Sequence, residues 1–253
     1  MFKRMTRLFF LISLFYTFTI CSALYGQGMK GKFAISGTGG FGFPVGDFSD
    51  KEKGRAQTGY SLGANLEHFI IENLSAGVSF RYQKFGMYVK DLENDFIKSV
   101  HDSDAEAETS GIDIDSHKSI VHLGIFGKYH FLTWRNVSPY AKLGAGWGKL
   151  EGFADMPGYV VYPEYTITID RTADASYDGD FYIDVGGGIF YLFSEKLGIS
   201  GELLFTHLAL DGNSGTVMTK SQADGYFEEY EEEKELDYNS SYINLFVSLT
   251  YFF

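Results

Sequence analysis

Hydrophobic and polar residues alternate with a period of two along most of the chain after residue 30. The alternation is plainest from Ser241 to Phe253, where every odd-numbered position from Ile243 onward is apolar and Asn, Ser and Thr occupy even-numbered positions. Successive side chains of a β-strand point to opposite faces, so this pattern predicts a long strand between two different environments. Seven further segments alternate in the same way, over residues 32–43, 60–70, 74–87, 117–131, 138–151, 179–193 and 197–210.

The lengths of these eight strands and of their connections predict a membrane barrel. The strands have roughly 11–15 residues, whereas strands of soluble sheets have about 5–6 and a tilted membrane strand needs about 9–11. Short connections (71–73, 132–137, 194–196) alternate with long ones (44–58, 88–116, 153–178, 211–240). We therefore predict an all-β, eight-stranded antiparallel up-and-down transmembrane β-barrel in the outer membrane, with periplasmic termini and four extracellular loops.

Closure of such a barrel predicts which strands pair and which residues meet lipid. An open sheet edge in hydrocarbon leaves backbone groups unpaired at several kcal/mol each, so the last strand must pair with the first. Its odd-numbered residues then face lipid, and aromatic residues form a girdle at each membrane interface. The expected periplasmic girdle is Tyr129, Phe131, Tyr191, Phe193, Tyr251 and Phe253, and the expected outer belt is Phe41, Tyr82, Trp147, Phe181 and Phe205.

The first residues are typical of a secretory signal peptide. A basic stretch, MFKRMTR, precedes an apolar run of about 13 residues and then small residues. Cleavage after Gly26 is favoured over cleavage after Ala23, which makes residues 1–26 the signal and 27–253 the barrel. Ile20 disfavours lipidation of Cys21, and removal of the signal leaves no cysteine for a disulfide.

The charge of the chain excludes nucleic acid as a partner. From residue 27 onward there are 18 basic and 33 acidic residues, a net charge of −15, whereas a phosphate-binding surface should be basic. The acidity is concentrated in three of the long connections, with net charges of −7 (88–116), −4 (153–178) and −7 (211–240). The expected extracellular surface is therefore acidic.

The combined pattern resembles the small outer-membrane β-barrel proteins of Gram-negative bacteria. The segment GGFGFPVGDF (Gly39–Phe48) is similar to that of the porin-like "outer membrane protein beta-barrel domain" family. The resemblance implies that the C-terminal strand, with Tyr251 and Phe253, is the signal read by the barrel-assembly machinery. It implies no activity, because this architecture hosts many functions.

Six charged residues share the inward-facing positions of the strands and predict a charge network in the lumen. They are Glu67, Arg81, Lys128, Lys142, Asp184 and Glu202, three of each sign. An eight-stranded barrel is just wide enough for its own side chains, so the favoured interpretation is a polar plug, with a narrow ion or solute path as the alternative. Inward glycines such as Gly124, Gly146 and Gly186 leave room for large neighbours or for water.

The acidic loops indicate either a solvated, repulsive surface or a binding site for divalent cations or a basic host protein. Asp113, Asp115 and FEEYEEEKE (Phe227–Glu235) are the candidate positions, although no calcium-loop spacing occurs. Tyr159–Asp170 alternates like a strand and predicts a hairpin that extends the wall above the membrane. At the outer strand ends, Lys84, Lys149 and His207 have lipid-facing parity and are candidates for contacts with lipopolysaccharide phosphates.

No residue pattern supports a metal site, a cofactor or a catalytic group. GTGGFG (Gly37–Gly42) matches a dinucleotide-binding pattern, but no helix is expected after it. His207 precedes Asp211 and Ser214, yet these residues match no motif of a lipid A enzyme. We therefore expect a non-enzymatic protein with a structural or surface-interaction role. The alternatives are a narrow channel or a component of outer-membrane assembly or secretion.

Overall fold

The computed structural model describes residues 29–88, 90, 93, 97–98, 108–110, 114–131, 136–161, 166–223 and 226–253. The expected signal peptide and Asp113 lie outside the described residues. Among the described residues, no helix is long and apolar enough to cross a membrane.

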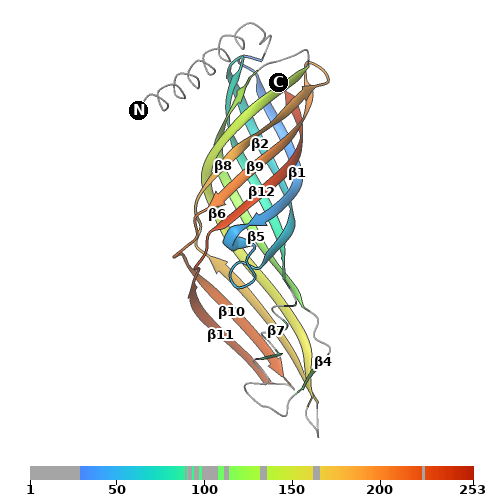
Figure 1. The fold of residues 1–253 in the computed structure, drawn as a ribbon, viewed down its shortest axis with the longest axis vertical. Coiled ribbons are helices and arrows are strands. Elements are labelled where there is room, and N and C mark those ends of the chain that lie inside the picture. The colour runs from blue at the N-terminus through green and yellow to red at the C-terminus, as the bar shows by residue number, and fades with distance from the viewer. Residues whose placement is uncertain are drawn as a thin grey trace, which may run out of the picture.

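The structure is an antiparallel β-barrel with a sheet that projects from one end (Figure 1). Eight strands form the barrel: β1 (Phe33–Val45), β2 (Ala56–Ile71), β3 (Leu74–Met87), β5 (Asp115–His130), β6 (Val137–Val161), β8 (Asp180–Leu192), β9 (Leu197–Leu208) and β12 (Ser240–Phe252). Each pairs with its neighbours in chain order, and β1 pairs with β12 from Ala34↔Phe252 to Val45↔Ser241. The predicted eight-stranded up-and-down barrel is confirmed.

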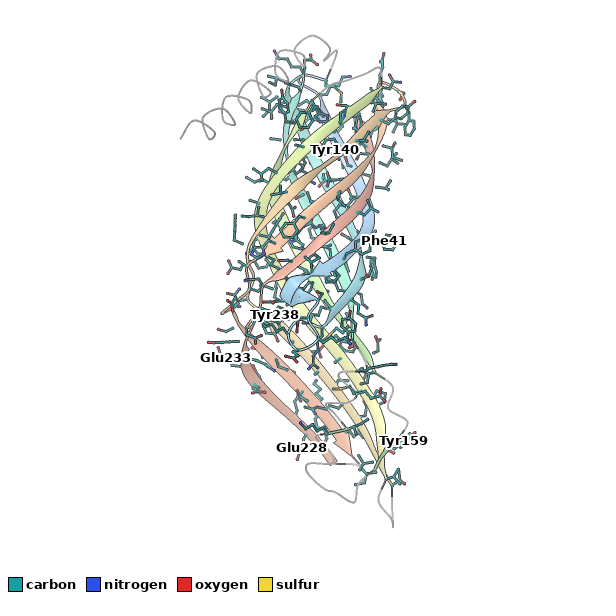
Figure 2. All side chains as sticks on the ribbon, viewed as in Figure 1. Phe41, Tyr140, Tyr159, Glu228, Glu233 and Tyr238 are labelled. Atoms are coloured by element: carbon teal, nitrogen blue, oxygen red, sulfur yellow. The ribbon has the colours of Figure 1, made fainter. Side chains whose placement is uncertain are left out.

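The two faces of the barrel wall differ as the alternation predicts. Leu123, Ile125 and Leu143 point outward and are 59%, 66% and 62% exposed, whereas Tyr242, Phe246 and Phe252 point inward and are buried. Phe41 is labelled on the outer surface in Figure 2. A continuous outer band of exposed Leu, Ile, Val and Phe is far larger than a water-facing surface carries, and it is suited to lipid.

Glycines on the inner face make room for large aromatic side chains. A Cβ at Gly124 or Gly146 would overlap the ring or hydroxyl of Tyr182, which lies over the neighbouring strands β6 and β5. A Cβ at Gly42 would lie 2.8 Å from the ring of Phe85. The space left open by these inward glycines is therefore filled by neighbouring aromatic rings.

Beyond the barrel, four strands continue as a sheet that we call the blade. It consists of the outer part of β6 (from Glu151 to Val161), β7 (Thr166–Tyr177), β10 (Ser214–Ala223) and β11 (Tyr226–Glu235), paired in that order. The short strand β4 (Glu108–Ser110) pairs with the other edge of β6. The C-terminus lies at one end of the barrel and the blade at the other (Figure 1).

The blade differs from the sequence-based expectation for residues 153–178 and 211–240. The predicted hairpin is present, but it is built from long strands, because β6 extends to Val161 and β7 begins at Thr166. Strands β10 and β11 lie where we expected an irregular loop. Their sequences, SGTVMTKSQA and YFEEYEEEKE, lack the alternation of apolar and polar residues by which the barrel strands are recognised, since much of the blade faces solvent on both sides.

Candidate functional site

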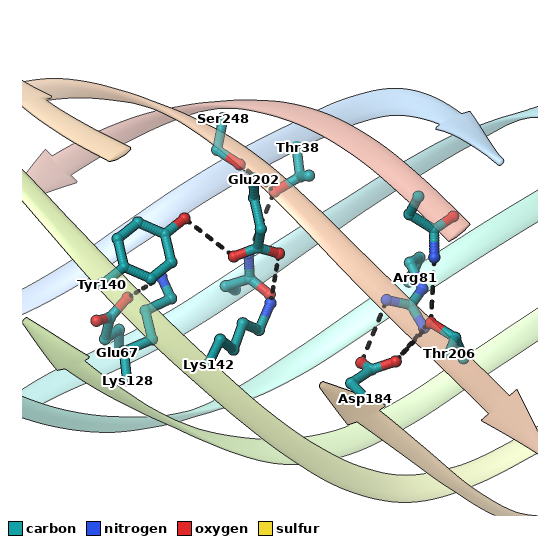
Figure 3. Close-up of polar contacts among 12 residues, drawn as sticks. Thr38, Glu67, Arg81, Lys128, Tyr140, Lys142, Asp184, Glu202, Thr206 and Ser248 are labelled. Atoms are coloured by element: carbon teal, nitrogen blue, oxygen red, sulfur yellow. Dashed lines mark hydrogen bonds and ion pairs between the residues drawn. The ribbon is translucent and has the colours of Figure 1, made fainter. Parts of the chain in front are cut away.

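The lumen holds two layers of ion pairs, shown in Figure 3. In the first layer, Lys128 Nζ lies 2.8 Å from Glu67 Oε2, and Ser75 also donates to Glu67. Next to it, Lys142 Nζ lies 2.9 Å from Glu202 Oε1, and the Tyr140 hydroxyl donates to Glu202 Oε2 at 3.0 Å. All of these side chains come from inward positions of the strands and are buried.

The second layer is a hydrogen-bonded chain around Arg81. Arg81 donates to both carboxylate oxygens of Asp184, at 3.3 and 3.2 Å, and Thr206 donates to Asp184 Oδ1 at 2.6 Å. Asn244 donates to Thr206 at 3.1 Å and accepts from Gln83 at 2.5 Å. These contacts join β3, β8, β9 and β12 across the barrel.

The six charged residues expected in the lumen therefore lie there as three ion pairs. A buried charge without a partner costs several kcal/mol, whereas paired and hydrogen-bonded charges are tolerated. Space between the layers is small: a cavity beside Arg81, Lys142 and Glu202 has a volume of about 20 Å³. That is room for about one water molecule.

The end of the barrel that carries the C-terminus is closed by aromatic side chains. Phe69, Phe190 and Phe252 pack together with Tyr140 and Ala34, all buried. The ring centroids of Phe252 lie 5.9 Å from Phe69 and 5.7 Å from Phe190.

The opposite mouth is closed by a plug from the loop that follows β1. The 3₁₀ helix η1 (Gly46–Phe48) begins at a left-handed Gly46 (φ +60°) and turns Phe48 into the mouth. Phe48 is fully buried and packs edge-on against Phe85, with ring centroids 5.2 Å apart. Further buried residues complete this layer: Ile120, Leu150, Tyr182, Leu208, Leu210, Leu236, Tyr238 and Tyr242.

The alternation pattern does not predict this plug, because Phe48 and Tyr238 lie in connections that we expected to be extracellular loops. Two features of the sequence indicate it. An aromatic residue closes the glycine-rich segment at Phe48, and Leu236 and Tyr238 continue the inward parity of β12 into the preceding connection. Both features are consistent with chain that folds back over a barrel mouth.

The remaining candidate residues lie on the outer surface. Lys149 forms a 3.0 Å ion pair with Glu151, and His207 Nδ1 lies 2.8 Å from the Ser241 hydroxyl. Lys84 on β3 pairs in register with Ser119 on β5, and Ser119 pairs in turn with Glu151 on β6. Tyr251 and Phe253 are exposed at the C-terminal end, with stacked rings 6.4 Å apart.

A closed antiparallel barrel with an apolar outer band and ion-paired polar groups inside is an integral outer-membrane β-barrel. No protein-family model matches the chain. No curated protein matches it either.

Solved structures similar to this chain are outer-membrane proteins. Neisserial surface protein A is 12% identical, covering 87% of this chain and 98% of that chain, with a TM-score of 0.40. The attachment invasion locus protein Ail of Yersinia pestis is 14% identical, covering 89% and 100%, with a TM-score of 0.40. A major outer membrane protein from Thermus thermophilus is 13% identical, covering 87% and 99%, with a TM-score of 0.48.

The Arg81–Asp184 pair provides a test of the lumen network. Asp184→Leu should lower the free energy of unfolding by about 3–5 kcal/mol, because it leaves the Arg81 guanidinium buried without a carboxylate. Arg81→Met combined with Asp184→Leu should recover much of that loss. Denaturant titration of the folded barrel in lipid vesicles measures both values.

Lys220→Met is the matched control, because it breaks the solvent-exposed ion pair with Glu229 in the blade. Its effect should stay below about 1 kcal/mol. An Asp184→Leu effect as small as that of the control would contradict a stabilising role for the lumen pairs.

Proposed function

We propose that this protein is a non-conducting outer-membrane barrel whose blade binds a basic polypeptide outside the cell. The observation that carries the proposal is strand β11, which pairs only with β10 among the described residues and so presents one sheet edge. That strand carries six glutamates and one lysine between Tyr226 and Glu235. Glu228 and Glu233 are labelled on it in Figure 2.

The geometry of β11 favours an extended ligand. Glu228 and Glu235 are separated by about 23 Å at about 3.3 Å per residue, which suits an extended basic segment better than a single ion. An exposed strand edge offers backbone hydrogen bonds to an added strand, and the glutamates would select lysine or arginine side chains. The same charges discourage pairing with a second acidic copy.

The barrel supports the blade without taking part in transport in this proposal. Aromatic side chains close both ends of the barrel, and the cavity beside the charged pairs of the lumen holds about one water molecule. We infer a structural role for the lumen residues and no enzymatic role, since each of the six charges is engaged in an ion pair. A narrow channel and an assembly or secretion component are the alternatives.

We also propose that Lys84 and Lys149 contact lipopolysaccharide phosphates. Both side chains lie at or just beyond the level of the outer aromatic belt, since Lys149 pairs in register with Val121 and Val121 with Tyr82. A groove of about 450 Å³ lies beside them on the outer face, lined by His117, Phe153 and Met218 among others. Burial and, to a smaller extent, the nearby Lys84 ammonium lower the pKa of His117, which lines this groove.

A non-conducting barrel should carry no ionic current in planar bilayers. The purified protein should give no stepwise currents, because both mouths and the lumen are filled by side chains. A matched variant that exchanges Phe48, Phe85 and Tyr238 for Ala tests whether the plug is what blocks ion flow at the blade end of the barrel. Stepwise currents from the unaltered protein would favour the channel alternative instead.

The acidic blade predicts charge-dependent binding of a basic peptide. Exchanging the six glutamates of β11 for Gln should weaken binding of a fluorescent nona-arginine peptide at least tenfold, measured by fluorescence anisotropy. The affinity of the unaltered protein should also fall with added salt, because the charges are exposed. A control with Asp47, Asp50 and Glu52 neutralised should bind within twofold of the unaltered protein, and an equal loss in this control would overturn a specific role for β11.

The lysines at the outer belt predict a change in bound lipid. Lys84→Met with Lys149→Met should reduce the lipopolysaccharide that co-purifies with the barrel, as measured by mass spectrometry. Lys32→Met with Lys196→Met, at the C-terminal end of the barrel, is the matched control and should leave that amount unchanged. If the first pair of substitutions has no more effect than the second, the contact does not exist.

A further inference from the structure

A cavity of about 600 Å³ lies outside the plug, where the barrel meets the blade. Four parts of the chain enclose it: the turn after η1 (52–55), Lys118 on β5, the inner faces of β6 and β7, and the segment from Lys234 to Tyr238. Figure 2 labels Tyr238 at this junction. Its volume is that of a site for a small organic molecule, typically about 300–1,000 Å³.

The walls of this junction cavity are flat on one side and aromatic on the other. Gly152, Ala154, Ala173 and Ala175 line the side formed by β6 and β7, where Gly152 pairs with Ala175 and Ala154 with Ala173. No long side chain projects from these four positions. Tyr177 and Tyr238 also line the cavity, so a planar apolar group would meet small residues and aromatic rings.

The floor of the junction cavity carries a buried ammonium group. Lys118 is 8% exposed, and its Nζ donates to the carbonyl of Gly54 at 2.6 Å and to the Tyr238 hydroxyl at 2.5 Å. Within the described residues it forms no ion pair with a carboxylate, unlike the three charged pairs of the lumen. Arg55 also lines the cavity, and its Nε donates to the carbonyl of Lys51 at 2.9 Å.

The acids of the junction cavity lie elsewhere. Glu52, Glu235 and Asp237 are exposed, so they form its rim, while Lys118 is buried. A buried charge surrounded by neutral partners is costly, and an anion brought next to it recovers that cost. The cavity therefore has a positive floor, an apolar middle and a hydrated rim.

We propose that the junction cavity binds a small organic acid with a planar apolar body, its carboxylate at Lys118 and its ring between the alanines and the tyrosines. This site is separate from the blade edge, and its test does not depend on peptide binding there. The ligand class follows from the positive floor, the flat wall and the volume.

Binding at this site is linked to protons. Lys118 lies beyond the membrane, three residues outside Val121, whose partner Tyr82 belongs to the outer belt. Burial, with a smaller contribution from Arg55, lowers the pKa of Lys118 to about 7. A bound carboxylate favours the charged ammonium, so affinity is full below pH 7 and falls as the pH rises above it.

The other charged and titratable groups facing this cavity come from three places: Glu52, Lys53 and Arg55 from the turn after η1, Tyr177 from β7, and Lys234 and Glu235 of β11 with Asp237 and Tyr238 just after it. Asp47 raises the pKa of Lys53, and burial raises the pKa of Tyr177 and Tyr238. These shifts carry all three groups away from neutral pH, so Lys118 accounts for the expected titration near pH 7.

The test uses 4-fluorobenzoate as the probe and the full protein in detergent micelles, followed by fluorine NMR. The unaltered protein should bind 4-fluorobenzoate at least tenfold more tightly than the uncharged, equally shaped 4-fluorobenzamide. Lys118→Met should weaken benzoate binding at least tenfold, and the affinity of the unaltered protein should fall about tenfold or more from pH 6 to pH 8.5. Lys220→Met, which removes an exposed lysine of the blade that does not line the cavity, is the matched control and should bind within twofold of the unaltered protein.

A second variant keeps the test decisive if Lys118→Met disturbs the plug. Ala173→Trp places a large ring in the junction cavity while keeping Lys118, Gly54 and Tyr238, and it should abolish benzoate binding; heat-dependent gel mobility verifies the folded barrel in each variant. The proposal is overturned if benzoate and benzamide bind equally, if folded Ala173→Trp still binds benzoate, or if the unaltered protein shows no binding at millimolar concentration. Retained binding in folded Lys118→Met would overturn it too, because the Lys118 ammonium would then only join Gly54 to Tyr238.

Discussion

The pairing of every backbone polar group within the membrane is the constraint on which the rest of this structure depends. In hydrocarbon an unpaired N–H or C=O costs several kcal/mol, so β12 must find β1, which lies more than 200 residues earlier in the chain. The hydroxyls of Ser36 and Thr250 add a 2.9 Å hydrogen bond inside this seam. Once the sheet closes, its side chains are divided into a set that meets lipid and a set that must fill a narrow lumen.

The filling of that lumen explains both its glycines and its charges. Tyr182 occupies the space that a side chain at Gly124 or Gly146 would need, and Phe85 similarly depends on Gly42. Charged groups are stable there only as pairs, which is how Arg81 meets Asp184. The junction cavity differs, because its lysine has neutral partners and faces space that a ligand can enter.

The sequence predicts the barrel well because one physical signal, alternation, repeats in every membrane strand. Lipid on one face and packed side chains on the other require this alternation. Strands β1 and β12 can therefore be recognised in the sequence, and so can their pairing. The strands of the blade are not predicted, because solvent reaches both faces of this sheet. A strand such as Tyr226–Glu235 then has no apolar face by which it could be recognised in the sequence. The positions of Phe48 and Lys118 depend on how the first loop folds over the mouth, which local sequence does not specify.

The length of β6 determines how far the blade can extend from the barrel. Its 25 residues belong to one unbroken strand that is part of the barrel wall at Val137 and part of the blade at Val161. From Trp147, in the outer belt, fourteen residues at about 3.3 Å each allow a projection of at most about 46 Å. The blade is therefore a spacer as well as a surface, because it carries the Tyr226 end of β11 away from the barrel mouth.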